Sequence, residues 1–178
     1  MGGRARVKIV VCGCCFVLQA EDSIRDHLWS RGLGDVYKGQ EQTLESSARI
    51  FRGICAACHQ PNGRGNANAG YPPLVNSEWV LNESPSRAIA IVAKGLQGPI
   101  EVAGQVYDKV AMPSQGAALS DEDIANVISY IRRNGDWGDA HSLPLVTLEQ
   151  VKAVRETIAD RSAPWTADEL VQQFPDSQ

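Results

Sequence analysis

The stretch ICAACHQPNGRG at residues 54–65 constrains what this chain can fold into more than any other feature of its sequence. Two thiols, Cys55 and Cys58, are separated by two residues, and His59 follows directly. Such a group can form a disulfide, bind zinc or attach a haem. A disulfide would close only a small ring and would give His59 no role. A zinc site usually needs four ligands, and the sequence after the motif offers no second cysteine pair and one further histidine, His141.

The order C-x-x-C-H favours the third alternative, because it is the attachment signature of c-type haem. The two thiols add to the porphyrin vinyl groups as thioethers, and the histidine comes next so that its ring nitrogen reaches the iron from the same face. A redox-active CxxC of the thioredoxin type is expected in a βαβ unit. Here the apolar residues before the motif recur at helical spacing instead, at Leu44, Ala48, Phe51 and Ile54. The sequence therefore predicts one covalent haem c at the end of a helix.

A haem iron with histidine on one side often takes methionine on the other, which raises its reduction potential. Apart from Met1 the chain has one methionine, Met112, in the irregular segment VAMPSQG. A methionine that only fills the core would more often lie in the apolar stripe of a helix. We therefore interpret His59 and Met112 as the iron ligands. His141 is the rival sixth ligand, but it lies in a loop where we expect a solvated histidine.

Capping patterns predict four helices after the motif. The first has Ser84 as its cap, Pro85 in its first position and Gly95 just past its end. The others each begin at a serine or threonine that is followed three residues later by an acid or amide, in the pairs Ser120–Asp123, Thr147–Gln150 and Thr166–Glu169. A short hairpin is expected around Gly104. The second of these helices should bury one stripe, formed by Ile124, Val127, Ile128 and Ile131.

In combination these features resemble a class I c-type cytochrome domain over residues 41–134. The resemblance is carried by the helix that leads into CAACH, by GRG, YPPL and the AMP loop, and by LSDEDIANVISYIR. It implies an all-α class I cytochrome c fold, in which helices surround one covalently bound haem. It also implies that Cys55 and Cys58 attach the haem, with His59 as proximal and Met112 as distal ligand. Residues 135–178 would then form a C-terminal extension of loop plus helix.

The same resemblance implies contacts around the histidine. A backbone carbonyl of Pro72 or Pro73 should accept the ring N–H of His59, and Pro73 is placed among the haem-binding residues. Such a bond fixes the orientation of the ring and tunes the iron. The crossing of the first and last helices of the family implies that Gly53 faces Tyr130, as a small residue that admits an aromatic ring.

Three further side chains are candidates for hydrogen bonds to the haem propionates. Trp79 is placed in the haem site, because an indole combines an apolar body with one N–H donor. Tyr107 and Arg87 offer the same kind of donor. The alternative is core packing for Trp79 and Tyr107, and a solvated helix face for Arg87.

The net charge of the chain limits which kinds of partner it can bind. The chain carries 17 basic and 21 acidic side chains, a net charge of −4, and has no basic cluster, so no nucleic acid is expected as a partner. Residues 1–40 hold six of the basic and four of the acidic side chains, which leaves a net charge of −6 for residues 41–178. The acidic charge favours partners with basic docking surfaces. The resemblance implies that these partners are redox proteins, namely a dehydrogenase donor and a cytochrome or oxidase acceptor.

The first forty residues stand apart from the rest. MGGRARVKIVVCGCCFVLQA can be interpreted as a secretory signal, with a basic start and an apolar stretch. The stretch QAEDSIRDHLWSRGLGDVYKGQ has no apolar period, and residues 1–40 resemble translated sequencing-adapter read-through. Thioether attachment of haem takes place outside the bacterial cytoplasm, so we expect a periplasmic or extracytoplasmic location. Membrane association is expected only if an anchor exists, since no apolar run is long enough to span a bilayer.

With both axial positions filled by protein, the iron has no open site for a substrate. We therefore predict outer-sphere transfer of single electrons between redox partners, and no enzymatic activity. An alternative is that the chain is the C-terminal relay domain of a larger secreted dehydrogenase of the quinoprotein type, which sequences of this kind resemble. A more distant alternative is an open-site haem enzyme or sensor, in which Met112 does not bind the iron.

Overall fold

The structure, a computed structural model, describes residues 45–175. All of them belong to one compact unit, Gly39–Gln178. The predictions made for residues 1–40 lie outside the described residues. Along residues 45–175 no helix is both long and apolar enough to cross a bilayer.

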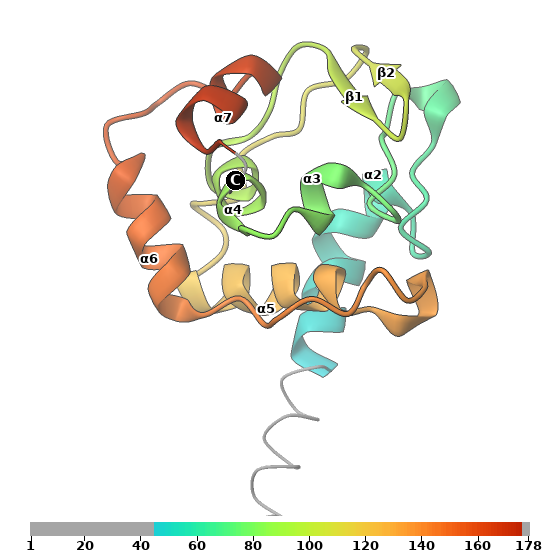
Figure 1. The fold of residues 1–178 in the computed structure, drawn as a ribbon, viewed down its shortest axis with the longest axis horizontal. Coiled ribbons are helices and arrows are strands. Elements are labelled where there is room, and N and C mark those ends of the chain that lie inside the picture. Colours follow the sequence, from blue (N-terminus) through green and yellow to red (C-terminus); the bar gives the residue numbers. More distant parts are fainter. Residues whose placement is uncertain (1–44, 176–178) are drawn as a thin grey trace, which may run out of the picture. The chain divides into compact units, whose positions relative to one another are not determined.

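Helices make up nearly all of the regular structure (Figure 1). Residues 45–50 are α-helical and continue into the π-helix η1. The elements that follow are η1 (Phe51–Cys55), α2 (Ala56–His59), η2 (Ala67–Ala69), α3 (Glu78–Leu81), α4 (Ser86–Lys94), β1 (Ile100–Val102), β2 (Gln105–Tyr107), α5 (Asp121–Arg132), η3 (Gly135–Trp137), α6 (Leu148–Thr157) and α7 (Ala167–Gln173). β1 and β2 form the antiparallel hairpin expected around Gly104. The predicted all-α fold class is confirmed, with this hairpin as a small addition.

The helical segment 45–59 crosses α5 (Figure 1), and aromatic side chains form the contact. Phe51 is fully buried, and its ring centroid lies 5.4 Å from that of Tyr130 and 5.5 Å from that of Trp137. The prediction that Gly53 faces Tyr130 is wrong. A Cβ atom at Gly53 would have no heavy atom within 4 Å, because the glycine lies on the exposed side of the helix.

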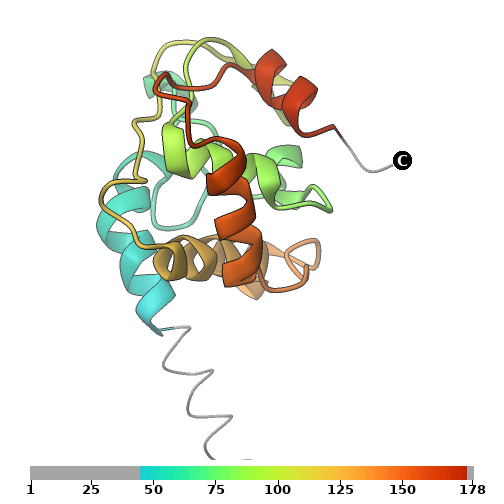
Figure 2. The same cartoon turned by 90° about the vertical axis from the view of Figure 1, so that its left-hand side faces the viewer.

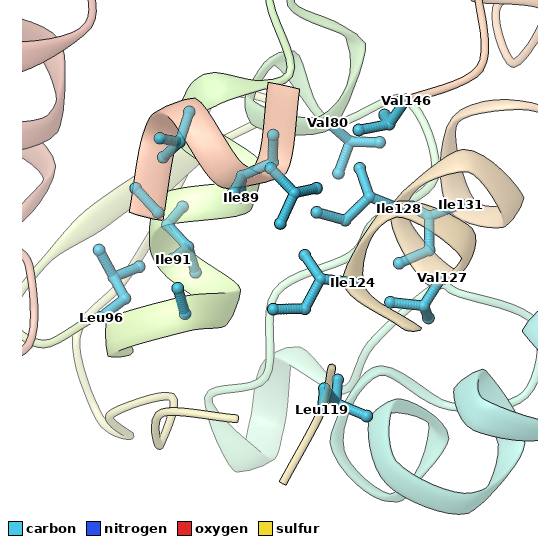
Figure 3. Packing of buried hydrophobic residues seen from close by; sticks show 14 of the residues in the cluster. Val80, Ile89, Ile91, Leu96, Leu119, Ile124, Val127, Ile128, Ile131 and Val146 are labelled. Carbon is cyan, nitrogen blue, oxygen red and sulfur yellow. The ribbon is translucent and has the colours of Figure 1, made fainter. Parts of the chain in front are cut away.

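The core lies between α4 and α5 (Figure 3). The predicted stripe of α5 is buried, and its side chains meet Ile89 of α4 and Val80 of α3 in the same cluster. The helix starts as predicted, since Ser120 and Asp123 form a complete capping box. Its last turn holds Arg132, which is buried and donates to the carbonyl oxygens of Val80, Asn82 and Glu83. These carbonyls end α3, so one cation fixes that helix against α5.

The C-terminal extension, residues 135–175, packs on this core. Figure 2 shows α6 lying across α4 and α5, and α7 packs on α4. Both helices begin at the predicted capping pairs, Thr147 with Gln150 and Thr166 with Glu169. Apolar side chains of these helices and of the segment between them belong to the main hydrophobic cluster, including Val151, Val154, Ile158, Trp165 and Leu170. The extension is thus part of the same hydrophobic core as α4 and α5.

Candidate functional site

The CxxCH motif lies where a π-helix passes into the short helix α2. Single π-helical turns within α-helices are often found at functional sites. Cys55 ends η1, and Cys58 and His59 belong to α2, which stops at Gln60 with a φ of 65°. Both cysteines are half-buried free thiols, and His59 is 8% exposed. The predicted helix into the motif is therefore present, with a local widening directly before the first thiol.

The loop after the motif returns the chain to His59. Gly65 donates its N–H to the His59 carbonyl at 2.9 Å and has a φ of +63°. A Cβ atom there would lie 2.4 Å from the Tyr71 carbonyl oxygen, so this position requires glycine. The chain then turns through Asn66 and Tyr71, which form an isolated antiparallel bridge. This turn brings the carbonyl oxygen of Pro72 to 2.9 Å from Nδ1 of His59.

The hydrogen bond of His59 fixes the state of its ring. A carbonyl oxygen can only accept, so Nδ1 carries the proton and the lone pair of Nε2 is left for a metal. The acceptor is Pro72, whereas Pro73 forms part of the cavity wall described below. Burial lowers the pKa of His59, and the bond to Pro72 opposes this in part. The imidazole is thereby held in its neutral, metal-binding form.

A single cavity brings the predicted site residues together. Counted with its opening to solvent, it encloses about 1220 Å³ that no protein atom occupies. Its wall includes all six residues that the sequence assigned to the cofactor: Cys55, Cys58, His59, Pro73, Trp79 and Met112. The remaining wall is largely apolar, and α4, α5 and the hairpin contribute aliphatic side chains to it, including Ile91, Val92, Ile100, Val102, Val127 and Ile128. Apolar walls with a few convergent polar groups are typical of cofactor pockets.

The residues present fit a haem. Two thiols, one imidazole with a free Nε2 and one thioether all line the same apolar cavity. Sulfur and imidazole donors are the axial ligands of c-type haem iron. Burial raises the pKa of the Cys55 thiol to about 11, and the neighbouring Cys58 adds to the shift. The Cys55 thiol is thus held in its protonated form in this structure.

Met112 is half-buried and held by a reciprocal backbone pair. The N–H of Leu96 donates to the Met112 carbonyl at 3.0 Å, and the N–H of Met112 donates to the Leu96 carbonyl at 2.8 Å. Leu96 directly follows Gly95, which ends α4 with a φ of +86°. A Cβ atom at Gly95 would lie 2.6 Å from the Met112 carbonyl oxygen. The Met112 backbone therefore approaches the end of α4 as closely as glycine allows.

The side chains proposed as propionate donors are engaged elsewhere in the structure. Trp79 lines the cavity, but its indole N–H donates to the Glu101 carbonyl at 2.8 Å. Tyr107 also lines the cavity, and its hydroxyl donates to Gln105. Arg87 is not a solvated side chain: it is buried, stacks near Trp79 at 5.8 Å and donates from Nε to a carbonyl in the extension. The Trp79 indole N–H, the Tyr107 hydroxyl and Nε of Arg87 thus each donate a hydrogen bond to another group of the protein.

His141 is not the solvated loop residue that we expected. It is 2% exposed and lies edge-on to Trp137. Its Nδ1 bonds the Ile131 carbonyl oxygen at 2.7 Å, and its Nε2 accepts the backbone N–H of Asn76 at 3.2 Å. Both ring nitrogens are thus engaged, and the residue does not line the cavity. His141 joins the extension to the core and has no free nitrogen for iron.

The zinc alternative finds no support among the described residues. Within residues 45–175 no three side chains of histidine, cysteine, aspartate or glutamate gather in a way that could hold a metal ion. The cysteine pair and His59 face an apolar cavity instead of further ligands.

Comparison with known proteins agrees with this geometry. The sequence model of the family described as cytochrome c matches residues 44–134. The chain belongs to the cytochrome c family. Its cofactor is accordingly haem c, and its chemistry is electron transfer. The matched range ends within two residues of α5, so the extension lies beyond it.

Known relatives of this cytochrome c domain include a cytochrome c-552 and proteins named as subunits of dehydrogenases and of an oxidase. Cytochrome c-552 of Thermus thermophilus is 40% identical over 107 residues, which cover 57% of this chain and 78% of that protein. The cytochrome c subunit of alcohol dehydrogenase (quinone) of Gluconacetobacter polyoxogenes is 33% identical over 109 residues, or 61% of this chain and 22% of the subunit. The cbb3-type cytochrome c oxidase subunit FixP of Azorhizobium caulinodans is 26% identical over 105 residues, or 59% of this chain and 32% of that subunit.

Sequence reasoning did not identify Leu96 as a support of Met112, and it left open whether Pro72 or Pro73 supports His59. Both act through backbone atoms, so side-chain chemistry gives no signal for them. A usable signal was present in the glycines: Gly95 and Gly65 each precede or begin the turn that brings the supporting carbonyl close. An isolated glycine beside a ligand segment indicates such a close backbone approach.

Proposed function

We propose that this chain is a monohaem electron carrier in which Cys55 and Cys58 attach haem c, and His59 and Met112 ligate its iron. The observation that carries the proposal is that one apolar cavity is lined by all four side chains, with Nε2 of His59 left free by its bond to Pro72. Bound haem would supply a one-electron iron couple at this site.

The protein's own residues would keep that site closed. The Pro72 carbonyl holds the His59 ring, and the backbone of Leu96 holds the backbone of Met112. Both ligands are therefore positioned by hydrogen bonds within the protein itself. Aliphatic side chains of α4 and α5 would exclude water from the cavity. A site with both axial positions filled offers no position for substrate, which supports a carrier and not an enzyme.

The first test is covalent attachment. The chain would be exported with a c-type maturation system, denatured and examined by haem staining and a pyridine haemochrome spectrum. We expect haem to stay on the chain with a two-thioether spectrum, and we expect Cys55→Ser and Cys58→Ser each to shift that spectrum to one thioether. A chain without covalent haem, under conditions that mature a control cytochrome, would contradict the proposal.

The second test concerns the sixth ligand. Met112→Ala should open the iron to imidazole, whereas Val171→Ala, which removes an exposed apolar side chain from α7, should not. If the unaltered protein already binds imidazole as readily as Met112→Ala, the site is open. In that case the alternative of an open-site haem enzyme or sensor would replace the electron carrier.

The partners would be redox proteins outside the cytoplasm. The relatives that are dehydrogenase or oxidase subunits support this. They also support the alternative that this chain serves as the electron-relay part of a larger secreted dehydrogenase, since it spans only 22% of the alcohol dehydrogenase subunit. In either case residues 41–178 carry a net charge of −6, so docking to a basic partner should slow as salt is raised. A periplasmic or extracytoplasmic location follows from haem attachment and is tested by cell fractionation.

A further inference from the structure

The segment that carries Met112, here termed the Met112 loop (residues 108–119), has almost no regular structure of its own. Its backbone is held from outside by the end of α4. Besides the Leu96 pair, Gln115 donates its N–H to the Val92 carbonyl at 2.9 Å, and the Ser114 hydroxyl donates to the Ala93 carbonyl at 2.6 Å. An irregular segment of this kind belongs to the part of a structure that opens most easily, unless neighbours fix it.

The C-terminal extension fixes the other side of the same support. Leu96 forms an antiparallel bridge with Met112 and a parallel bridge with Trp165. The N–H of Trp165 donates to the Gly95 carbonyl at 3.0 Å, and the N–H of Gln97 donates to the Trp165 carbonyl at 2.8 Å. Leu96 is thus the central member of a three-segment ladder. The extension pairs with one edge of it, and the proposed iron ligand pairs with the other.

A second contact from the extension reaches the Met112 loop directly. Arg155 of α6 donates to the Gly116 carbonyl at 3.2 Å and to the Leu119 carbonyl at 3.5 Å. The same guanidinium pairs with Asp121, in the first turn of α5, at 3.1 Å. Arg155 therefore joins the end of the Met112 loop to the start of the next helix. Hydrogen bonds from a charged donor are stronger than neutral ones.

The extension is itself firmly attached where it supports the ladder. The Trp165 side chain is 5% exposed, and the Arg161 guanidinium lies 3.7 Å from its ring centroid. Phe174 packs edge-on against the same ring. The carbonyl of Phe174 accepts a hydrogen bond from Arg87 of α4 at 2.7 Å. The Trp165 backbone is therefore held in place by α4 and by α7.

We propose that the C-terminal extension is a brace that keeps Met112 in the haem cavity, with Arg155 and Trp165 as positioning residues. This inference rests on the proposed function, in which Met112 is the distal ligand. A thioether is a neutral ligand on a flexible side chain, so its occupancy of the site depends on how firmly its backbone is held. Weakening the brace increases the fraction of molecules in which the Met112 loop is open.

That fraction is measurable, because an added ligand such as imidazole enters only when Met112 has left. The apparent affinity for imidazole rises in proportion to the open population. The amide protons of Met112 and Leu96 provide an independent measure, since they exchange with solvent only when the ladder opens. The second measurement requires no ligand and no redox partner.

The test uses the full haem-loaded chain and the variant Arg155→Met, which removes the donors and keeps the aliphatic stem. Its matched control is Lys152→Met, which removes one positive charge from an exposed position on the same helix. We expect Arg155→Met to raise the imidazole affinity and the exchange rates of the Met112 and Leu96 amides roughly tenfold. Lys152→Met should stay within about twofold of the unaltered protein.

A second variant, Trp165→Leu, removes the ring that holds the Trp165 backbone beside Leu96. It should likewise raise the imidazole affinity and the amide exchange rates. It also covers the case in which Arg155→Met does not retain haem. The proposal is overturned if the folded variants match Lys152→Met in both imidazole affinity and amide exchange. Failure of the underlying function is distinguishable: if Met112→Ala leaves imidazole affinity unchanged, Met112 is not the ligand. In that case faster amide exchange in Arg155→Met would still report the brace.

Discussion

The imidazole of His59 donates from Nδ1 to the backbone carbonyl of Pro72, thirteen residues away, at 2.9 Å. This one bond decides which nitrogen faces the cavity, because the protonated Nδ1 leaves Nε2 with the free lone pair. The bond exists only because the intervening loop folds back on the motif. Gly65 makes that return possible, so the integrity of the ligand depends on a residue without a side chain.

Gly65→Ala should therefore disturb the site from a distance. The new Cβ would overlap the carbonyl oxygens of Tyr71 and Pro72, and alanine disfavours a φ of +63°. We expect a loss of about 3 kcal/mol in the free energy of unfolding, measured by urea denaturation. Gly53→Ala is the matched control, because it lies in open space within a helix and should stabilise by up to about 1 kcal/mol. Equal changes in unfolding free energy for the two substitutions would show that the close backbone approach at Gly65 does not determine the stability of the loop.

The buried position of His141 leads to a second prediction. His141→Phe keeps the ring but leaves the Asn76 N–H and the Ile131 carbonyl without their partner. We expect a loss of about 2–4 kcal/mol in unfolding free energy, since buried polar groups that lose a hydrogen bond are costly. The visible spectrum of the haem-loaded protein should stay unchanged, because this residue does not line the cavity. A spectral change like that of Met112→Ala would instead mean that His141 reaches the iron.

The contact between α5 and the extension gives a third prediction. The Ser129 hydroxyl accepts the backbone N–H of Val146 at 2.8 Å, and both residues are buried. Ser129→Ala leaves that N–H unsatisfied and should cost about 1–3 kcal/mol in urea denaturation. Ser142→Ala, at an exposed position nearby, should change the same quantity by less than about 0.5 kcal/mol. Indistinguishable midpoints for the two variants would argue that the extension contributes little stability here.

The sequence predicted those features that depend on local chemistry. All three capping pairs became complete capping boxes, since a cap needs only residues three apart. The hairpin at Gly104 and the stripe of α5 follow from turn chemistry and from helical spacing in the same way. The six residues assigned to the cofactor line one cavity in the structure. Their proximity could be predicted because the resemblance to the family implies that they surround one haem.

The misplaced residues depend on partners that are distant in sequence. His141 was expected to be solvated because one of its hydrogen-bond partners, the backbone N–H of Asn76, lies 65 residues away in the sequence. No residue near His141 in the sequence indicates this contact. The Trp79 N–H finds the Glu101 carbonyl, a backbone atom that composition does not reveal. The choice between Pro72 and Pro73 depends on which carbonyl the turn directs at His59, and a sequence pattern does not resolve one residue of rotation. The π-helix that ends at Cys55 has no signature in the sequence.

Acid provides the last test, on the attachment of α7. The Glu169 carboxylate accepts the backbone N–H of Thr166 at 2.9 Å and pairs with Arg161 at 2.6 Å. The Thr166 N–H, followed by Arg161, lowers the pKa of Glu169 below its ordinary value. A carboxyl whose pKa is lower in the folded than in the unfolded state stabilises the fold above its unfolded pKa. That stabilisation is lost as the pH falls through the lower, folded pKa.

Glu169→Gln should therefore lower the thermal unfolding midpoint near neutral pH, and the difference from the unaltered protein should shrink as the pH falls below about 4. The measurement is a series of melting curves at several pH values. Glu156→Gln, at an exposed position on α6, removes the same charge and should show no such dependence. A constant difference between Glu169→Gln and the unaltered protein at all pH values would mean that the charge of Glu169 does not hold α7. Because α7 packs beside Trp165, loss of this charge should also loosen the ladder that ends at Met112.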